Sequence, residues 1–259
     1  MSRPRTLRCQ GLVLRRHDVG ESDRVVVMFT RERGKLRAVA KGARKTSSRK
    51  AGHLELFTHV DVLLEQRRDM DFVGQVDTLD SFRAIREDLT RTSLAYLVTE
   101  LVDSLTEEGD EQPELFDLTV QALESLQDAP DPRLVVDHFA MQLLELLGFR
   151  PAIGECLRCG SELEPGSNFF SPFLGGALCP RCGPAEPSAS AIATPTLKLL
   201  RNLQRLRRPG SLRVVIPLDV QRETSRVLRE LIERHSERRL RSTAFIARLR
   251  TLDETTTPS

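Results

Sequence analysis

Two Cys-x-x-Cys pairs are the residues whose type and spacing most directly indicate chemistry. Cys156 and Cys159 form the first pair, and after nineteen intervening residues Cys179 and Cys182 form the second. Pairs at this spacing present four thiolates to a single ion, as in tetrahedral zinc sites. A glycine directly follows each pair, which suits the tight turns of such a site. The sequence therefore predicts a four-cysteine metal site.

A metal ion held by four thiolates has no open position for water, so we expect one structural zinc ion and not a catalytic one. The same cysteines are compatible with a thioredoxin-type redox pair or with an iron–sulfur cluster. No strand–helix–strand pattern surrounds the pairs, which disfavours the redox alternative. The fifth cysteine, Cys9, lies in an apolar run, and we predict that it is a small buried core residue.

The second group is a basic stretch, residues 40–52, in which small residues separate the cations. Small residues let phosphates approach closely, and each neutralised phosphate releases counterions, so this pattern predicts a nucleic-acid contact loop. A solvated charged loop is the alternative, and further cations before residue 40 favour the first interpretation. The predicted contact residues are Arg16, Arg24, Lys35, Arg37, Lys41, Arg44, Lys45, Arg49 and Lys50.

Aromatic side chains that could stack on bases are few in this part of the chain. Phe29, Phe57 and Phe72 are the available rings, and each is equally compatible with a place in the core. The chain has no Trp and a single Tyr. We therefore expect binding that is mostly to the phosphate backbone and independent of sequence.

Motifs of catalysis are missing from the sequence. The five histidines are scattered, and there is no phosphate-binding loop, Gly-x-Ser-x-Gly elbow or His-Glu-x-x-His helix. The acidic run at 107–111 could mimic paired metal carboxylates, but it fits a solvated loop between helices better. We expect a protein that is not an enzyme.

The spacing of apolar residues, which predicts the elements that position these side chains, changes near Asp80. Before it, short runs of β-type residues are separated by glycines and charged turns, and residues 53–65 alternate strictly between apolar and polar. Five short strands favour a closed barrel, because closure removes exposed edges. The predicted strands are 7–15, 24–30, 36–40, 53–65 and 72–79.

After Asp80 the apolar period is that of helices, which makes the fold class α+β with several domains. The predicted helices are 83–107, one that begins at Pro113, 132–147, 194–207 and 219–239. The predicted domains are a barrel at 1–80, a helical domain made of 81–152 and 185–250, a cysteine-bearing insertion at 153–184 and a disordered tail at 251–259.

Charge is segregated along the chain although the formal net charge is only +2. Residues 1–52 carry +11, residues 53–145 carry −16 and residues 146–259 carry +7. No run of about 18 apolar residues and no signal-peptide pattern is present. We therefore expect a soluble cytoplasmic protein.

With these residues in view, the chain resembles the bacterial recombination mediator family RecO over about residues 6–250. The order of the matching motifs is more specific than any one of them. The matching stretches are 20–24, 30–34, 40–45, Leu-Gly-Phe at 147–149 with Pro151, the two cysteine pairs, and 240–242 with Phe245.

The resemblance implies an N-terminal OB-fold (oligonucleotide-binding) barrel and a C-terminal all-helical domain with an inserted four-cysteine zinc finger. It implies a function in DNA repair and recombination, in which the protein binds single- and double-stranded DNA and anneals complementary strands. It further implies that the protein, with RecR, helps to load RecA onto DNA coated by single-strand-binding protein (SSB), and that it is associated with the nucleoid.

SSB proteins usually present an acidic tail with a hydrophobic end, which the −16 block should repel. We therefore expect the tail to bind between C-terminal helices, at cations drawn from Arg201, Arg205, Arg207, Arg208, Arg226 and Arg229. Two other function classes stay open on the residues alone. One is a zinc-containing OB-fold protein that binds RNA, and the other is a nucleic-acid enzyme with an unrecognised site.

Overall fold

The computed structural model describes residues 5–68, 70–206 and 215–236. They belong to two compact units, the first ending at Asp128 and the second beginning at Ala129. The predicted division into barrel, helical domain, cysteine insertion and tail stays a prediction, and its tail lies outside the described residues. Three helices that follow the barrel pack with it in the first unit.

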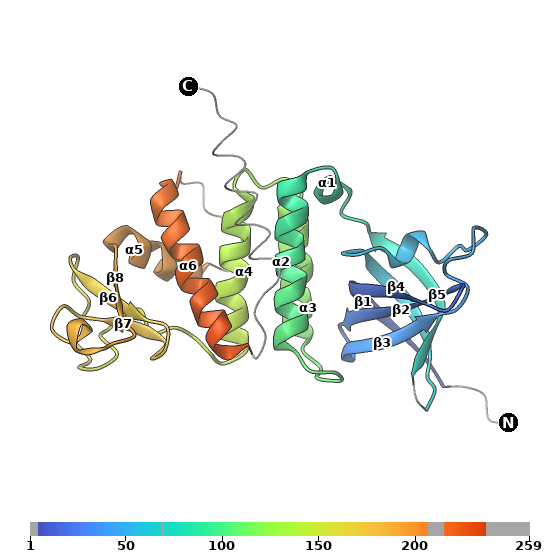
Figure 1. The fold of residues 1–259 in the computed structure, drawn as a ribbon, viewed down its shortest axis with the longest axis horizontal. Coiled ribbons are helices and arrows are strands. Elements are labelled where there is room, and N and C mark those ends of the chain that lie inside the picture. The colour runs from blue at the N-terminus through green and yellow to red at the C-terminus, as the bar shows by residue number, and fades with distance from the viewer. Residues whose placement is uncertain (1–4, 69, 207–214, 237–259) are drawn as a thin grey trace, which may run out of the picture. The chain divides into compact units, whose positions relative to one another are not determined.

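Five strands of the first unit close into a barrel in the order β1-β2-β3-β5-β4 (Figure 1). The strands are β1 (Thr6–Val19), β2 (Asp23–Thr30), β3 (Gly34–Ala40), β4 (His59–Glu65) and β5 (Asp71–Asp80). All pairings are antiparallel except that between β3 and β5, which is parallel and limited to Ala38 with Asp71 and Val39 with Phe72. The predicted closed barrel is confirmed.

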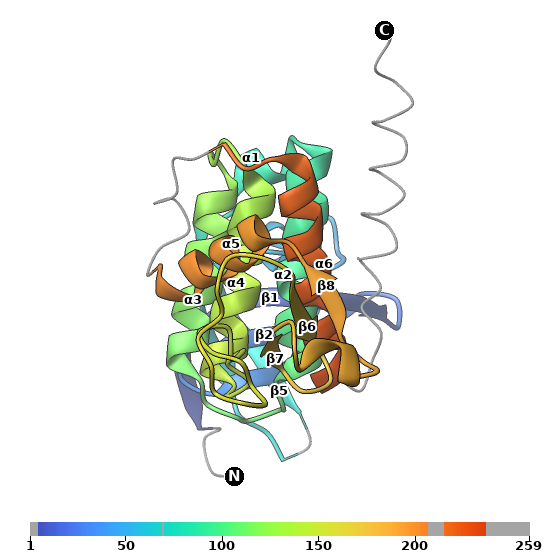
Figure 2. The same cartoon turned by 90° about the vertical axis from the view of Figure 1, so that its left-hand side faces the viewer.

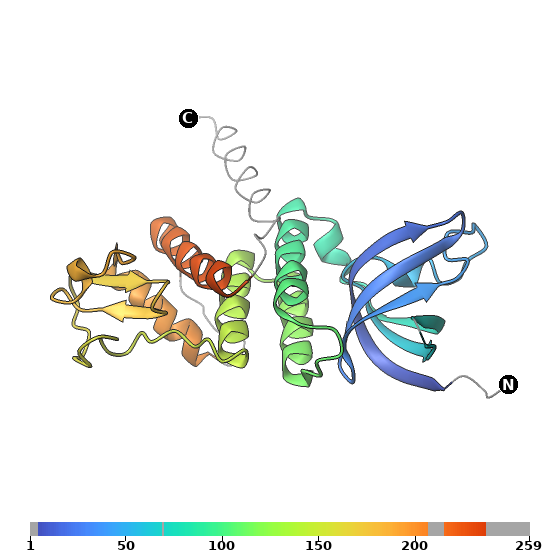
Figure 3. The same cartoon turned by 60° about the horizontal axis from the view of Figure 1, so that its bottom comes forward.

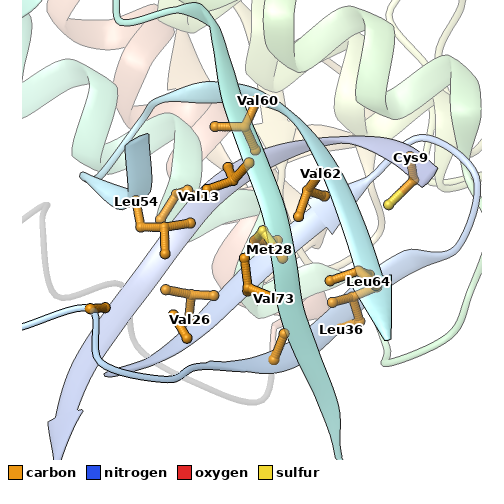
Figure 4. Close-up of a cluster of buried hydrophobic side chains, with 14 residues drawn as sticks. Cys9, Val13, Val26, Met28, Leu36, Leu54, Val60, Val62, Leu64 and Val73 are labelled. Atoms are coloured by element: carbon orange, nitrogen blue, oxygen red, sulfur yellow. The ribbon is translucent and has the colours of Figure 1, made fainter. Parts of the chain in front are cut away.

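The barrel core explains the alternating sequence pattern. Along β4, Val60, Val62 and Leu64 point inward while their neighbours are half-buried (Figure 4). Cys9 is 2% exposed in the same cluster, so its prediction as a core residue is confirmed, and burial raises the pKa of its thiol to about 12. Figure 3 shows how the long strands curve around this core.

The predicted strand over 53–65 is too long at its N-terminal end. Residues Gly52–Leu54 form a short 3-10 helix, and the strand begins only at His59. Between them Phe57 adopts φ 65°, a left-handed conformation that interrupts an extended chain. Leu54 is nevertheless buried in the barrel core, so its apolar character reflects packing and not strand structure.

The predicted helix over 83–107 is divided in the structure into α1 (Arg83–Arg86) and α2 (Leu89–Leu105). Asp88 caps α2, because its carboxylate accepts a hydrogen bond from the backbone N–H of Arg91 at 2.8 Å. The buried face of α2 contains Leu94 and Val98, whereas Leu89 in its first turn is 62% exposed. Helix α3 spans Pro113–Leu126 and begins at the predicted proline.

A close contact joins the β2–β3 turn to the loop between α2 and α3. The buried ammonium of Lys35 donates to the carbonyl oxygens of Asp103 and Thr106, both at 2.6 Å, at the C-terminal end of α2. Gly34 has φ 59°, and a Cβ atom there would overlap the carbonyl oxygen of Asp110. This contact therefore requires a glycine at position 34 for both conformation and space.

The second unit combines three helices with a small three-stranded sheet, which lies in front of the helices in Figure 2. Its elements are α4 (Pro132–Leu146), β6 (Asn168–Ser171), β7 (Gly176–Leu178), a 3-10 turn (Gly183–Ala185), β8 (Ser190–Ile192), α5 (Thr194–Arg205) and α6 (Leu218–His235). The three helices pack against one another. The predicted last helix, 219–239, is too long, because α6 ends at His235 and Ser236 is extended.

Candidate nucleic-acid interface and metal centre

The four paired cysteines converge in the second unit. Their sulfur atoms all lie within 4.8 Å of one another, and the Sγ atoms of Cys159 and Cys179 are 3.8 Å apart. A tetrahedron with Zn–S bonds of about 2.3 Å has edges of about 3.8 Å, so the sulfur cage has the right size for one zinc ion. The four-cysteine cluster is shown, and the identity of its metal stays a prediction.

Tight turns position these thiols, as predicted from the glycines that follow each pair. Gly160 has φ 70°, and its N–H donates to the carbonyl oxygen of Cys156 at 2.8 Å. The N–H of Gly183 donates to the carbonyl oxygen of Cys179 at 2.9 Å, and a Cβ atom at Gly183 would overlap the ring of Phe169. The two glycines serve different purposes, since the first supplies a left-handed turn and the second leaves room for a ring.

The surroundings shift the pKa values of two of the clustered thiols in opposite directions. Hydrogen bonds from the backbone, first that of Cys182, lower the pKa of the Cys179 thiol to about 6. Burial, together with the neighbouring thiols, raises the pKa of Cys182 to about 12. Backbone hydrogen bonds thus favour the thiolate form of Cys179, whereas burial opposes that of Cys182, and a bound divalent cation would favour the thiolate form of both.

Cations on the helix-facing side of the barrel are paired with the acidic block. Arg15 pairs with Asp103 at 2.8 Å, Arg31 with Asp117 at 2.9 Å and Arg37 with Glu108 at 2.6 Å. Lys35 is buried beside the same helix end. Of the predicted nucleic-acid contacts, Arg37 is therefore partly neutralised by Glu108. The ammonium of Lys35 is buried on backbone carbonyls and is not accessible to a phosphate.

Three further predicted contacts hold the basic loop in place. Arg24 and Arg44 both pair with Asp18, at 2.9 Å and 3.1 Å, and Arg16 pairs with Glu55. The side chain of Arg24 is only 14% exposed. The carboxylate partners of these arginines are Asp18 at the end of β1 and Glu55 in the loop between β3 and β4. We infer that the three arginines mainly hold this loop in place.

Asp23 ties the basic loop to the same turn. Its carboxylate accepts a hydrogen bond from the backbone N–H of Gly42 at 2.8 Å, and this bond holds the pKa of Asp23 below its usual value. The N–H of Arg44 donates to the carbonyl oxygen of Ser22 at 2.9 Å. The stretches 20–24 and 40–45, which are far apart in the sequence, are therefore joined by hydrogen bonds in the fold.

The remaining cations of the loop are the most available. Lys45 and Arg49 are exposed, and neither forms an ion pair with the residues that the structure describes. The Lys41 ammonium lies 4.6 Å from the centre of the Phe72 ring, and the ammonium of Lys50 donates to the carbonyl oxygen of Val73 at 2.6 Å. Lys41, Lys45 and Arg49 are thus exposed cations of the predicted interface, and Lys50 is half-buried beside them.

A pocket of about 470 Å³ opens beside them, where β3 meets β5. It is lined by Lys41, Lys50, Glu65, Arg67, Phe72, Val73 and Gly74. Arg67 and the exposed Arg68 were missed in the sequence analysis. The signal was available, because two adjacent arginines directly follow an alternating strand, where a hairpin turn presents side chains to solvent.

Only one of the three candidate stacking rings is accessible. Phe29 is 0% and Phe57 is 3% exposed, so both belong to the core, and the second packs edge-on against Tyr96 at 4.8 Å. Phe72 is half-buried and lines the pocket. Exposure thus leaves Phe72 as the ring with a surface for a base.

The C-terminal cations proposed for a partner tail are in unequal positions. The Nε of Arg201 donates to the carbonyl oxygen of Ile153 at 2.7 Å, and Arg226 pairs with Glu230 at 3.2 Å. Arg205 is exposed at the end of α5. Residues 207 and 208, like the matching motif at 240–245, lie outside the described residues. None of the described helices is long and apolar enough to cross a membrane.

Comparisons with known proteins agree on one family. Residues 1–82 match the model of the recombination protein O N terminal, and residues 86–244 match that of the recombination protein O C terminal. The DNA repair protein RecO of Roseiflexus sp. (strain RS-1) is 39% identical over 99% of this chain and 90% of the relative. That of Symbiobacterium thermophilum is 38% identical over 93% of this chain and 96% of the relative.

Proposed function

The chain belongs to the RecO family of DNA repair proteins, and on that premise we propose that it is a recombination mediator that acts without catalysis. It binds single- and double-stranded DNA and anneals complementary strands. With RecR, it helps to load RecA onto single strands coated by SSB. Displacement of the coat is driven by exchange of binding free energy and not by nucleotide hydrolysis.

The exposed cations of the β3–β4 loop are the observation that carries the DNA-binding part of this proposal. Lys41 and Lys50 line one pocket with Arg67, and Lys45 and Arg49 are exposed in the same loop. We add Arg67 and Arg68 to the proposed contacts. We leave out Lys35 because its ammonium is buried on helix carbonyls. Arg16, Arg24 and Arg44 support the loop, and Arg37 contributes weakly because Glu108 neutralises it.

Strand annealing on SSB-coated DNA, without nucleotide or magnesium, is the experiment that tests the proposed function. We expect complementary strands to anneal faster with the protein than without it, and RecR and SSB to co-purify with it in binding assays. A zinc-containing OB-fold protein that binds RNA is the second candidate, since a basic barrel serves either nucleic acid. Failure to anneal, together with a clear preference for RNA, would favour that candidate.

The salt dependence of binding should separate the exposed cations from the paired ones. Replacing Lys45 and Arg49 with glutamine is expected to weaken single-strand binding and to reduce the slope of log K against log salt. Each lost phosphate contact removes about 0.7 from the slope on single strands, so the pair should remove about 1.4. Fluorescence anisotropy of a labelled oligonucleotide at several salt concentrations measures the slope.

The matched control replaces two paired arginines, Arg31 and Arg37, with glutamine. These cations face Asp117 and Glu108, so their removal should change the slope by less than half as much. Equal slopes for the two double variants would show that ion pairing with the acidic block does not decide which cations meet DNA. An unchanged slope for Lys45 and Arg49 would make the loop a solvated face only.

We propose that one zinc ion is held by Cys156, Cys159, Cys179 and Cys182 and that its role is structural. When bound, such an ion supplies folding free energy to a segment whose strands have only three or four residues. The sulfur cage and the turns that form it support this proposal.

The acidic tail of SSB is proposed to bind at the end of α5. Arg205 is exposed there, whereas Arg201 and Arg226 are engaged with protein groups. Replacing Arg205 with glutamate should weaken binding of a tail peptide about fivefold, since an exposed charge contact contributes up to about 1 kcal/mol. The glutamine pair at Lys45 and Arg49 is the control, and equal peptide affinity for all three proteins would contradict this placement.

A further inference from the structure

The pocket beside the basic loop has the composition of a nucleotide site. Three of its lining residues are cations and one is an acid, Glu65, whose carboxylate already pairs with Arg67 at 3.3 Å. The Phe72 ring has the Lys41 ammonium 4.6 Å from its centre and the Arg67 guanidinium carbon at 5.9 Å. Both cations lie over the ring on long side chains, and a base that stacks on the ring would displace them toward its phosphates.

Strand geometry explains why this ring is accessible. Phe72 pairs with Val39 of β3 and with Glu65 of β4, at the short parallel junction where β3 and β5 share only two residue pairs. The register of β4 and β5 shifts between Leu63 and Leu64, opposite Gly74, which indicates a β-bulge. The bulge residue is Gly74, which lines the pocket and has no side chain to fill it.

We propose that this pocket takes one unstacked base of a DNA single strand, with Phe72 as the stacking surface and Lys41, Lys50 and Arg67 on the adjacent phosphates. This inference rests on the proposed DNA-binding function and goes further, because it assigns the preference for single strands to one site. The pocket is continuous with the exposed cations of the β3–β4 loop, through Lys41 and Lys50.

Duplex DNA cannot use the pocket in the same way. Its bases are paired and stacked, and to take one out costs a few kcal/mol. Duplex binding therefore depends on the cations of the loop alone, whereas a single strand gains both phosphate contacts and one stacked base. The two substrates should respond differently to loss of the ring and similarly to loss of the cations.

Replacing Phe72 with leucine keeps an apolar side chain on β5 and removes the aromatic face. We expect this variant to bind a single-stranded oligonucleotide about tenfold more weakly, which corresponds to about 1.4 kcal/mol of lost stacking. Its affinity for a duplex of the same length should stay within about twofold. Phe72→Trp, which keeps a stacking surface, should restore most of the single-strand affinity.

A cross-linking experiment gives a second, independent readout. A single strand that carries 5-iodouracil should cross-link on irradiation to Phe72 of the wild-type protein, as mapped by mass spectrometry of the peptides. Phe72→Leu should lose this cross-link. The same oligonucleotide annealed to its complement should give little product at this position.

The outcomes distinguish this inference from the proposed function. If the wild-type protein binds neither substrate, DNA binding itself fails. If it binds both and Phe72→Leu changes neither, or lowers both equally, the base-binding pocket is wrong while the loop interface stands. The double variant at Lys45 and Arg49 is the matched control, because it should weaken both substrates without loss of the cross-link.

Discussion

Replacing Cys156 and Cys159 together with serine is expected to abolish metal binding and to unfold the small sheet of the second unit. The sheet has strands of three or four residues, too short to be stable alone. Metal-binding free energy is folding free energy in such a site and reaches about 10–16 kcal/mol in zinc-finger peptides. Metal analysis of the purified protein, with hydrogen exchange over residues 152–192, measures both effects.

The control for this experiment is the cysteine outside the cluster. Cys9→Ala removes a buried thiol from the barrel and should leave one full equivalent of metal bound. It should cost stability only in the first unit. If the double serine variant keeps a full equivalent of metal, the ligand assignment is wrong. If it loses the metal and the sheet stays protected from exchange, the ion is not structural.

Replacing Gly34 with alanine is expected to destabilise the first unit by about 3 kcal/mol or more. A left-handed conformation costs about 1–2 kcal/mol for a residue with a Cβ atom. The atom would also overlap the carbonyl oxygen of Asp110, so the backbone must shift at additional cost. Fluorescence of the single tyrosine, Tyr96, reports on this unit during denaturation, because it lies in α2 and packs against Phe57.

Gly20 provides a matched control for the conformational part of this cost. It has the same φ of 59° as Gly34, but a Cβ atom there would meet nothing within 4 Å. Gly20→Ala should therefore cost only about 1–2 kcal/mol. Equal destabilisation by the two substitutions would mean that the contact with Asp110 relaxes freely. In that case the β2–β3 turn would not be held tightly against the helical loop.

The acidic block has a structural role that the charge pattern could not reveal. The block has a net charge of −16 and follows a segment of +11, and three of its carboxylates in or beside α2 and α3, those of Asp103, Glu108 and Asp117, pair with barrel arginines. These pairs are exposed or half-exposed, so each contributes little to stability. Their larger effect is to neutralise one side of the barrel, which leaves the β3–β4 loop and the β4–β5 turn as the basic surface.

Sequence patterns were reliable where the interaction is local. Alternation predicted the barrel strands, and the spacing of Cys156, Cys159, Cys179 and Cys182 predicted the sulfur cluster, because a knuckle is formed by residues three apart. Patterns failed at the bounds of elements: Leu54 is a core residue as its apolar character indicates, but it lies in a 3-10 helix and not in a strand, and the helix predicted over 83–107 is divided. The left-handed residue Phe57 delays the start of that strand, and the N-cap Asp88 begins a second helix. Neither feature changes the hydrophobic period.

The sequence by itself therefore determined the fold class, the four-cysteine cluster and the region that is basic. Only the tertiary structure decided which cations in that region are free. Arg15 and Asp103 are 88 residues apart, and Arg31 and Asp117 are 86 apart, so no local pattern predicts these pairs. The same holds for Phe72, since a ring becomes a core residue or a binding surface according to the strands that pack beside it.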